Sequence, residues 1–331
     1  MSDNSTVPAE HVLREKGWLP DGTRVASVES AGAGNMNLVE RVRFEDGVSV
    51  ILKRSRPWVE KYPDIPAPIE RASIEAAFYE TVSGTSAGRM MPALLNHDGA
   101  DACSVFADLG AGRDGMGLYA GETLPIEQLD AVARWTADLH AIEVSDEMRV
   151  AFRNQAMRAL NALHIFQFPL DPDNGFDLDA ITPGLQALGD ELKADQAFCT
   201  AVAEIGELYL RGQGMPDEAV LLHGDLYPGS WLTTEAGLFV IDPEFCWVGP
   251  PEWDVGVLSA HLRLSGQPET HVDRLISTYD RPLNRALLDQ ISGIEMMRRL
   301  MGVAQLPLEI GLDEKTALLD EARRLVIGDT L

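Results

Sequence analysis

The sequence predicts an α+β protein with two lobes: a small N-terminal lobe with an antiparallel sheet and one long helix, and a larger, mostly helical C-terminal lobe. Three observations support this prediction. The chain has 331 residues, enough for two structural units at roughly 150 residues each. Short apolar segments alternate with turns in the first third, and from residue 128 onward apolar residues recur at helical spacing. We place the boundary after residue 107, which gives lobes over 1–107 and 108–331.

The elements of the small lobe are predicted from turn signals and periodicity. Glu45-Asp-Gly47 is a tight-turn signal between two strand-like segments, so residues 38–53 are predicted to form a hairpin. Gly17 ends a short helix that has Pro8 in its first turn. In chain order we expect a helix over 7–16, strands over 24–29, 38–44 and 48–53, a helix over 69–82, and strands over 92–95 and 103–107.

The large lobe is predicted to be helical on both sides of one non-helical block, residues 220–253. This block contains two short apolar segments, Val220–Leu222 and Leu238–Ile241. Each ends directly in polar residues, His223-Gly-Asp225 after the first and Asp242-Pro-Glu244 after the second. A side chain at the end of a short strand sits on a rigid element, so these residues are candidates for a site.

Composition and charge exclude several classes of partner. Asp and Glu number 52 against 27 Lys and Arg, so the formal net charge is −25, and a polyanionic partner would meet a repulsive field. The longest stretch without a charge, residues 159–170, is shorter than the roughly 20 residues that a membrane-spanning helix needs. We therefore expect no nucleic-acid partner and no membrane partner.

Cysteine usage and the N-terminal sequence predict a cytoplasmic protein. The N-terminus lacks the basic start and apolar core of a secretory signal, so we expect the mature chain to be the whole chain. Cys103, Cys199 and Cys246 are far apart and form no Cys-x-x-Cys pair. A disulfide framework and a zinc site are therefore not indicated, and a reducing compartment fits.

The carboxylates that follow the two apolar segments are candidates for a metal site. The spacing between Asp225 and Asp242 leaves room for a turn and a return strand, so the two side chains can converge. An extended backbone over Asp242-Pro-Glu244, which Pro243 favours, would put both carboxylates of that motif on one side. Hard oxygen ligands so placed suit Mg²⁺. The alternative, that His223, Asp225 and Asp242 only cap turns, stays open for any one of them alone.

The glycine-rich stretch near residue 32 is neither a dinucleotide fingerprint nor a P-loop. Gly32-x-Gly34-x-x-Asn37 lacks a third glycine and precedes a strand, and no Gly-x-x-x-x-Gly-Lys-[Ser/Thr] occurs. Lys53 follows at the end of the next strand and Glu75 in the next helix. A loop over phosphates with a lysine paired to a helix glutamate is the nucleotide clamp of protein-kinase-like folds. A plain hairpin explains the turn alone, whereas the order of the parts favours the clamp.

The order of all these parts resembles the aminoglycoside phosphotransferase and choline kinase superfamily, and within it the chain is most similar to 5-methylthioribose kinases. The catalytic loop of that superfamily reads His-Gly-Asp, and its metal Asp follows on the next hairpin. The segments that carry the resemblance span nearly the whole chain: Gly32–Val39, Arg71–Glu75, Asp108–Leu109, Gly121–Glu122 with Pro125, His223–Leu226 with Gly229–Ser230, Ile241–Phe245, Gly249–Pro250, Asp254–Gly256, and Met297–Arg299 with Gly302 and Ala304.

The resemblance implies a two-lobed, protein-kinase-like fold and a phosphotransferase that uses ATP and Mg²⁺. It makes Asp225 the catalytic base and Asp242, Glu244 and Ser230 the metal site. Ser230 also marks the subtype, because most of the superfamily has Asn there and methylthioribose kinases have Ser. Adenine should bind at the hinge between the lobes. The nucleotide site implied for the small lobe and the hinge comprises Gly32, Gly34, Asn35, Asn37, Lys53, Glu75, Asp108 and Leu109.

Two late arginines are the candidate acceptor site, because Arg298 and Arg299 match a pair that binds the sugar in methylthioribose kinases. Apolar residues 287, 291 and 294 define one stripe of a helix, and Arg298 falls in the middle of that stripe. An unpaired charge there would be costly, so Arg298 should have an anionic or hydroxylic partner. The alternative is a structural salt bridge to one of the many acids of this chain, which would be favoured without the resemblance.

We therefore expect an ATP-dependent kinase that phosphorylates a hydroxyl of a small sugar, 5-methylthioribose or a related pentose. The alternatives are a phosphotransferase of the same superfamily acting on another small alcohol (an aminoglycoside, choline or a homoserine-like acceptor) and a nucleotide-binding pseudokinase. Three departures concern the substrate. The segment between Asp-Pro-Glu and the arginine pair is shorter than in methylthioribose kinases, Tyr227 replaces the family's His, and Ala107 occupies a usually acidic hinge position. A homodimer is left open.

Overall fold

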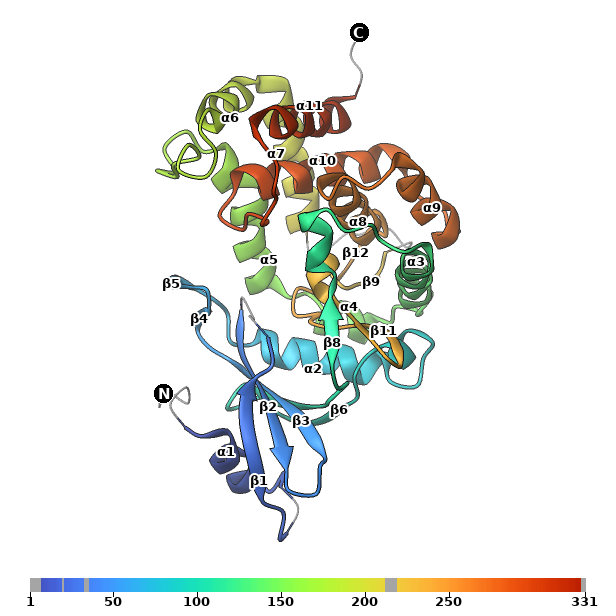
Figure 1. Cartoon of the computed structure of the whole chain (residues 1–331). Coiled ribbons are helices and arrows are strands. Elements are labelled where there is room, and N and C mark those ends of the chain that lie inside the picture. Colours follow the sequence, from blue (N-terminus) through green and yellow to red (C-terminus); the bar gives the residue numbers. More distant parts are fainter. Residues whose placement is uncertain (1–6, 20, 33–35, 212–218, 329–331) are drawn as a thin grey trace.

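The protein folds into a small lobe and a large lobe joined by one short segment (Figure 1). The computed structural model describes residues 7–19, 21–32, 36–211 and 219–328. The small lobe contains the strands near the N-terminus and helix α2, and the large lobe contains most of the helices. The predicted α+β, two-lobed fold is confirmed.

A five-stranded antiparallel sheet forms the small lobe in the described residues, with strand order β1-β2-β3-β7-β6. Buried residues of α1 pack on one face of it, together with Val42, Leu52 and Val105. Helix α2 contacts β3, β6 and β7 and contributes to the core that continues into the large lobe. The bounds are α1 Ala9–Glu15, β1 Val25–Ser30, β2 Asn37–Phe44, β3 Ser49–Ser55, α2 Arg71–Val82, β6 Leu94–Asp98 and β7 Cys103–Ala107.

Every strand and helix that we predicted for the small lobe is present, with ends shifted by a few residues. One hairpin was not predicted. Strands β4 (Trp58–Val59) and β5 (Tyr62–Pro66) pair with each other, and the Tyr62 hydroxyl donates a hydrogen bond to the carbonyl of Val303 in the large lobe at 3.3 Å. These strands are short, rich in charge and proline, and lack alternation, so periodicity does not reveal them.

The non-helical block of the large lobe forms two small sheets. Strands β8 (Gly112–Asp114), β10 (Trp231–Thr234) and β11 (Gly237–Val240) make one, and β9 (Val220–Leu222) with β12 (Trp247–Gly249) makes the other. The helices around them are α3 Ile126–His140, α4 Asp146–Ala151, α5 Gln155–Ala162, α6 Leu185–Ala194, α7 Gln196–Leu210, α8 Glu252–Leu264, α9 Glu269–Tyr279, α10 Arg285–Met301 and α11 Leu312–Ile327.

Helices α8 and α10 lie in the interior of the large lobe. They contact each other extensively, and α10 also packs on α11. Residues 291–301 of α10 are buried throughout, so this part of the helix has no exposed face and its charged residues need partners inside the protein. Met296, Met297 and Met301 belong to this core, as their spacing indicated.

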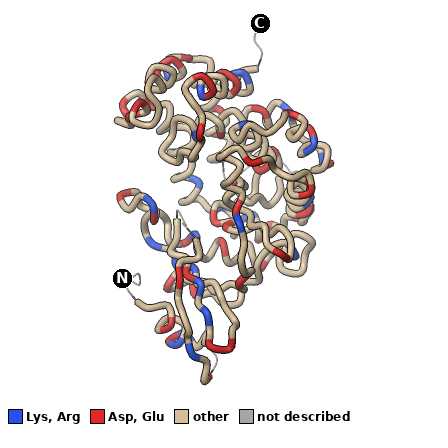
Figure 2. The backbone as a smooth tube through the Cα atoms, viewed as in Figure 1, with Lys and Arg blue, Asp and Glu red and all other residues tan. Residues whose placement is uncertain are grey.

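The connection between the lobes is short. The five-stranded sheet ends at Ala107, whereas β8 already pairs with β10 of the large lobe from Gly112. We propose residues 108–111 as the lobe boundary. Acidic positions occur along both lobes (Figure 2). In the described part of the chain, no helix is long and apolar enough to cross a membrane.

Candidate active site

A buried carboxylate, that of Asp254, fixes the backbone of the loop after β9. The backbone N–H groups of His223 and Gly224 donate to Asp254 Oδ2 and Oδ1 at 2.8 and 2.9 Å. Gly224 has φ +89°, and a Cβ there would lie 2.1 Å from the Phe245 carbonyl oxygen, so this position requires glycine. The loop therefore presents the next residue, Asp225, from a fixed backbone.

Asp254 is itself part of a fully buried chain of hydrogen bonds. His140 Nε2 lies 3.2 Å from Asp254 Oδ2, and its Nδ1 lies 2.9 Å from the Tyr279 hydroxyl. Burial alone would raise the pKa of Asp254, but the hydrogen bond from His140 and the nearby donors lower it. Asp254 thus stays ionised and fixes the backbone of residues 223–224.

The side chain of Asp225 contacts both predicted arginines. Arg298 Nη2 and Arg299 Nη2 donate to the same oxygen, Asp225 Oδ1, at 2.9 and 3.2 Å. Both arginines are buried, and the Asp225 side chain is 19% exposed. The Arg299 guanidinium also lies over the Tyr227 ring, 4.9 Å from its centroid. Arg298 therefore has the anionic partner that its place on the helix requires.

Glu295 of α10 accepts hydrogen bonds from both arginines, and it was not predicted as a site residue from the sequence. Its Oε1 accepts from Arg299 Nε at 2.8 Å, and its Oε2 accepts from Arg298 Nε. Burial alone would raise the pKa of Glu295, but the two guanidinium groups hold it well below its usual range. Its spacing three and four residues before the arginines was the available signal. We call Asp225, Glu295, Arg298 and Arg299 the arginine cluster.

A second charged group lies where the small lobe meets Asp242. Lys53 Nζ is 2.7 Å from both Glu75 Oε1 and Asp242 Oδ1. Burial would lower the pKa of Lys53, but Asp242 and Glu75 raise it well above its usual value, so Lys53 is charged. Burial raises the pKa of Glu75 to about 7. Lys53 lowers this pKa, whereas the nearby carboxylates of Asp242 and Glu244 raise it further.

The expected extended backbone over Asp242-Pro-Glu244 is wrong. Asp242 has φ +62°, and the Cys246 N–H donates to the Pro243 carbonyl, so the segment turns. Asn154 fixes this turn by donating to the carbonyls of Glu244 and Cys246. The two carboxylates consequently have different partners.

Glu244 points into the junction of the lobes. Its Oε2 accepts from Asn37 Nδ2 at 3.0 Å and from Arg71 Nε at 3.1 Å. Asn37 Oδ1 in turn accepts from Arg71 and Ser55. Asn37, which we expected to contact nucleotide, is thus a buried residue whose side chain links the two lobes by hydrogen bonds. We call Lys53, Arg71, Glu75, Asp242 and Glu244 the lysine cluster.

Asp242 is the carboxylate best placed to bind a metal ion. Its side chain is 47% exposed, and only its Oδ1 is engaged by Lys53. The Ser230 hydroxyl donates to the Asp225 carbonyl at 2.9 Å. No group of three or more His, Cys, Asp or Glu residues that could hold a metal occurs among the described residues. A single exposed carboxylate such as that of Asp242 still suits Mg²⁺, which takes one or two carboxylates and completes its shell with phosphate and water.

The remaining predicted nucleotide residues are placed as follows. Gly34 and Asn35 lie outside the described residues, and Gly32 has φ +131° at the start of the glycine-rich turn. The Asp108 carboxylate accepts from Arg41 and Ser49, so it anchors the connection between the lobes. Leu109 follows in that connection and is half-buried.

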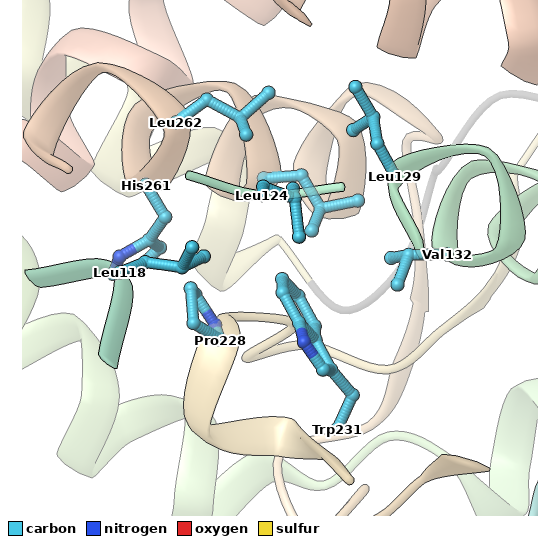
Figure 3. Close-up of a pocket in the computed structure, with 9 residues that line it drawn as sticks. Leu118, Leu124, Leu129, Val132, Pro228, Trp231, His261 and Leu262 are labelled. Carbon is cyan, nitrogen blue, oxygen red and sulfur yellow. The ribbon is translucent and has the colours of Figure 1, made fainter. Parts of the chain in front are cut away.

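An apolar cavity lies beside this site, between α3 and α8 (Figure 3). Its volume is about 10 Å³, the minimum for one water molecule. A sugar cannot enter this cavity, so the cavity is not the acceptor site. Figure 3 shows its lining residues, among them Leu118, Leu124, Leu129, Val132, Pro228, Trp231, His261 and Leu262.

The chain belongs to the phosphotransferase enzyme family, whose model matches residues 27–286. A methylthioribose kinase of Bacillus cereus is 30% identical over 271 residues, which cover 78% of this chain and 65% of that protein. The chain thus matches less than two thirds of the length of this relative. The predicted resemblance to this superfamily is confirmed.

Solved structures of several kinases share the fold of this chain. Choline kinase LicA from Streptococcus pneumoniae has a TM-score of 0.53 at 14% identity, with 96% of this chain and 98% of that chain covered. Spectinomycin phosphotransferase, solved with ADP and spectinomycin, has a TM-score of 0.55 at 13% identity, with 98% of each chain covered.

Proposed function

We propose that this protein is an ATP-dependent kinase that transfers the γ-phosphate to a hydroxyl of a small neutral sugar, 5-methylthioribose or a related pentose. One observation carries the proposal. Asp225, in the loop after β9, and Asp242, in the turn after β11, are each held through one oxygen by cations from elsewhere in the chain. Each carboxylate therefore keeps a second oxygen for a ligand.

The proposed roles follow from these positions. Asp225 accepts the proton of the acceptor hydroxyl as that oxygen attacks phosphorus, because it is the carboxylate that the catalytic loop presents. Lys53 steadies the phosphates, since its ammonium group lies beside Asp242 and is charged. Asp242 would hold Mg²⁺, which when bound neutralises phosphate charge. Ser230 and Glu244 stay predictions as further ligands.

The charge of the arginine cluster favours a neutral acceptor. Two guanidinium groups and two carboxylates balance there. A cationic acceptor such as choline or an aminoglycoside would have to lie next to two buried arginines, which disfavours it. A sugar presents vicinal hydroxyls that guanidinium groups can bind without excess charge.

The methylthioribose kinases of Bacillus are the relatives that support a pentose as acceptor. Because the match spans only 65% of the length of the Bacillus cereus enzyme, the acceptor of this protein requires its own test. We further propose that the protein works in the cytoplasm, where ATP is available.

The test is a transfer assay with MgATP and a panel of 5-methylthioribose, ribose, choline and an aminoglycoside, read by mass spectrometry of the acceptor. We expect phosphorylation of a neutral pentose and no product with Asp225→Asn. Binding of ATP without transfer to any acceptor would instead indicate a pseudokinase. Transfer to choline or the aminoglycoside alone would contradict the neutral acceptor.

A further inference from the structure

The arginine cluster is connected to two buried residues that the proposed chemistry does not use. His261 Nε2 lies 3.0 Å from Glu295 Oε1, and His261 Nδ1 lies 2.6 Å from the Tyr119 hydroxyl. His261 is 1% and Tyr119 3% exposed. We call Tyr119, His261 and Glu295 the relay.

The direction of every hydrogen bond in the relay is determined by its chemistry. Glu295 is ionised between two arginines and can only accept, so His261 Nε2 must carry a proton and donate. Burial lowers the pKa of His261 to about 4, so the ring is neutral and its Nδ1 accepts. The Tyr119 hydroxyl must then donate to Nδ1, since it too is buried and protonated.

The far end of this series is one oxygen of Asp225. Both arginines reach Glu295 through Nε and Asp225 Oδ1 through Nη2. A guanidinium group is planar and rigid, so a glutamate fixed at one edge fixes the direction of the other edge. In the part of the chain that the structure describes, Asp225 Oδ2 accepts no hydrogen bond.

We propose that the relay orients the arginine pair so that Asp225 Oδ1 is always occupied and Oδ2 alone receives the acceptor proton. Tyr119, His261 and Glu295 are thus positioning residues for a reaction whose identity rests on the proposed function. The proton of the acceptor hydroxyl passes to Asp225 Oδ2 while the hydroxyl oxygen forms its bond to phosphorus and the bond to ADP breaks.

The surroundings of His261 support this role. Its ring lies against Tyr119 and Tyr227, and the small cavity beside it is lined mainly by apolar side chains such as Leu118 and Leu262 (Figure 3). The residues that line this cavity are mostly apolar, and the two ring nitrogens of His261 bond Glu295 and Tyr119. A ring rotation would break the hydrogen bond to Glu295 and leave the buried Tyr119 hydroxyl without its acceptor, which costs free energy.

A histidine series tests the proposal through its donor atom. His261→Gln keeps an N–H at the position of Nε2, whereas His261→Leu removes it. We expect kcat/KM for the pentose acceptor to fall about tenfold or more in His261→Leu, to recover to within about threefold in His261→Gln, and KM for MgATP to stay unchanged in both. Equal kinetics of the two variants would overturn the proposal.

A matched pair of tyrosine variants covers the case in which His261→Leu does not fold. Tyr119→Phe and Tyr209→Phe each remove one buried hydroxyl: that of Tyr119 bonds His261 Nδ1, and that of Tyr209 accepts from Asn161 Nδ2, outside both charged clusters. We expect similar losses of thermal stability but a larger fall in acceptor kcat/KM for Tyr119→Phe. If both variants lose only thermal stability, the relay is structural and the proposal fails.

One readout does not depend on activity. Nitrogen-15 NMR of His261, assigned by its disappearance in His261→Gln, should show the neutral tautomer protonated at Nε2 from pH 6 to pH 8. A protonated ring or the Nδ1-protonated tautomer would contradict the relay. Absence of transfer to any acceptor, together with the expected tautomer, would count against the proposed function and leave the relay standing.

Discussion

The arginine cluster and the lysine cluster are built alike and differ in charge. In each, a carboxylate at the end of a short strand is held by a cation, and a buried glutamate backs that cation. The arginine cluster contains two cations and two carboxylates. The lysine cluster contains two cations and three carboxylates.

This difference indicates what each cluster binds. The lysine cluster has one negative charge too many, and the raised pKa of Glu75, about 7, shows that a proton can compensate for it in the absence of ligand. A divalent cation beside Asp242 would compensate for it instead. The arginine cluster needs no further charge, and so it suits a neutral acceptor.

Removing the charge of Asp225 should have the largest effect. Asp225→Asn is expected to lower kcat for phosphoryl transfer by about 10³-fold or more, because it removes the proton acceptor. MgATP affinity, measured by calorimetry, should stay nearly intact because nucleotide binds at the other cluster. Retained turnover would defeat the assignment of Asp225.

Asp242→Ala tests the lysine cluster in the same way. We expect the affinity for MgATP to fall about tenfold or more, since the principal carboxylate for the metal is lost. ATP binding without Mg²⁺ should not fall, because the variant removes a negative charge near the phosphates. Calorimetry that gives equal MgATP affinity in variant and parent would contradict this role.

Arg298→Ala separates the substrate claim from the kinase claim. We expect kcat/KM for the acceptor to fall about tenfold or more, equivalent to roughly 1.4 kcal/mol of transition-state stabilisation, with ATP affinity little changed. Arg274→Ala is the control, because Arg274 is an exposed arginine that pairs with Asp130 and belongs to neither charged cluster. Loss of thermal stability with normal acceptor kinetics would reduce Arg298 to a structural residue.

Glu75→Gln tests the lysine cluster without a kinetic measurement, through the dependence of stability on pH. A carboxyl group with a raised pKa in the folded state contributes stability below its unfolded pKa of about 4.5 and loses it as pH rises to about 7. The stability of the parent relative to Glu75→Gln should therefore decline between pH 4.5 and 7. Urea unfolding of both proteins across this range measures it, and a constant difference would exclude the raised pKa.

The sequence predicted the strand-end carboxylates and the lysine clamp because local patterns encode them. The apolar segments before Asp225 and Asp242 identify strand ends, and Lys53 and Glu75 stand in a recognisable order. Arg298 was predicted to need a partner, but its partners could not be identified, because an inward helical position says nothing of which distant loop faces it.

What could not be predicted depends on tertiary contacts. Glu295 could have been predicted from its helical spacing to the arginines, but His261 and Tyr119 come from two other elements. The positive φ of Asp242 contradicts the usual preference of a residue before proline. The turn that follows Asp242 is held by hydrogen bonds from Asn154, which is distant in sequence, to the carbonyls of Glu244 and Cys246.

The charge difference between the clusters is tested most directly by one matched pair of acceptors, ribose and 2-amino-2-deoxyribose, which differ by a hydroxyl replaced with an ammonium group. The measurement is kcat/KM for phosphorylation of each with saturating MgATP. A balanced arginine cluster predicts a value for ribose at least about tenfold higher. An equal or higher value for the amino sugar would contradict the neutral acceptor and the proposed reason for it.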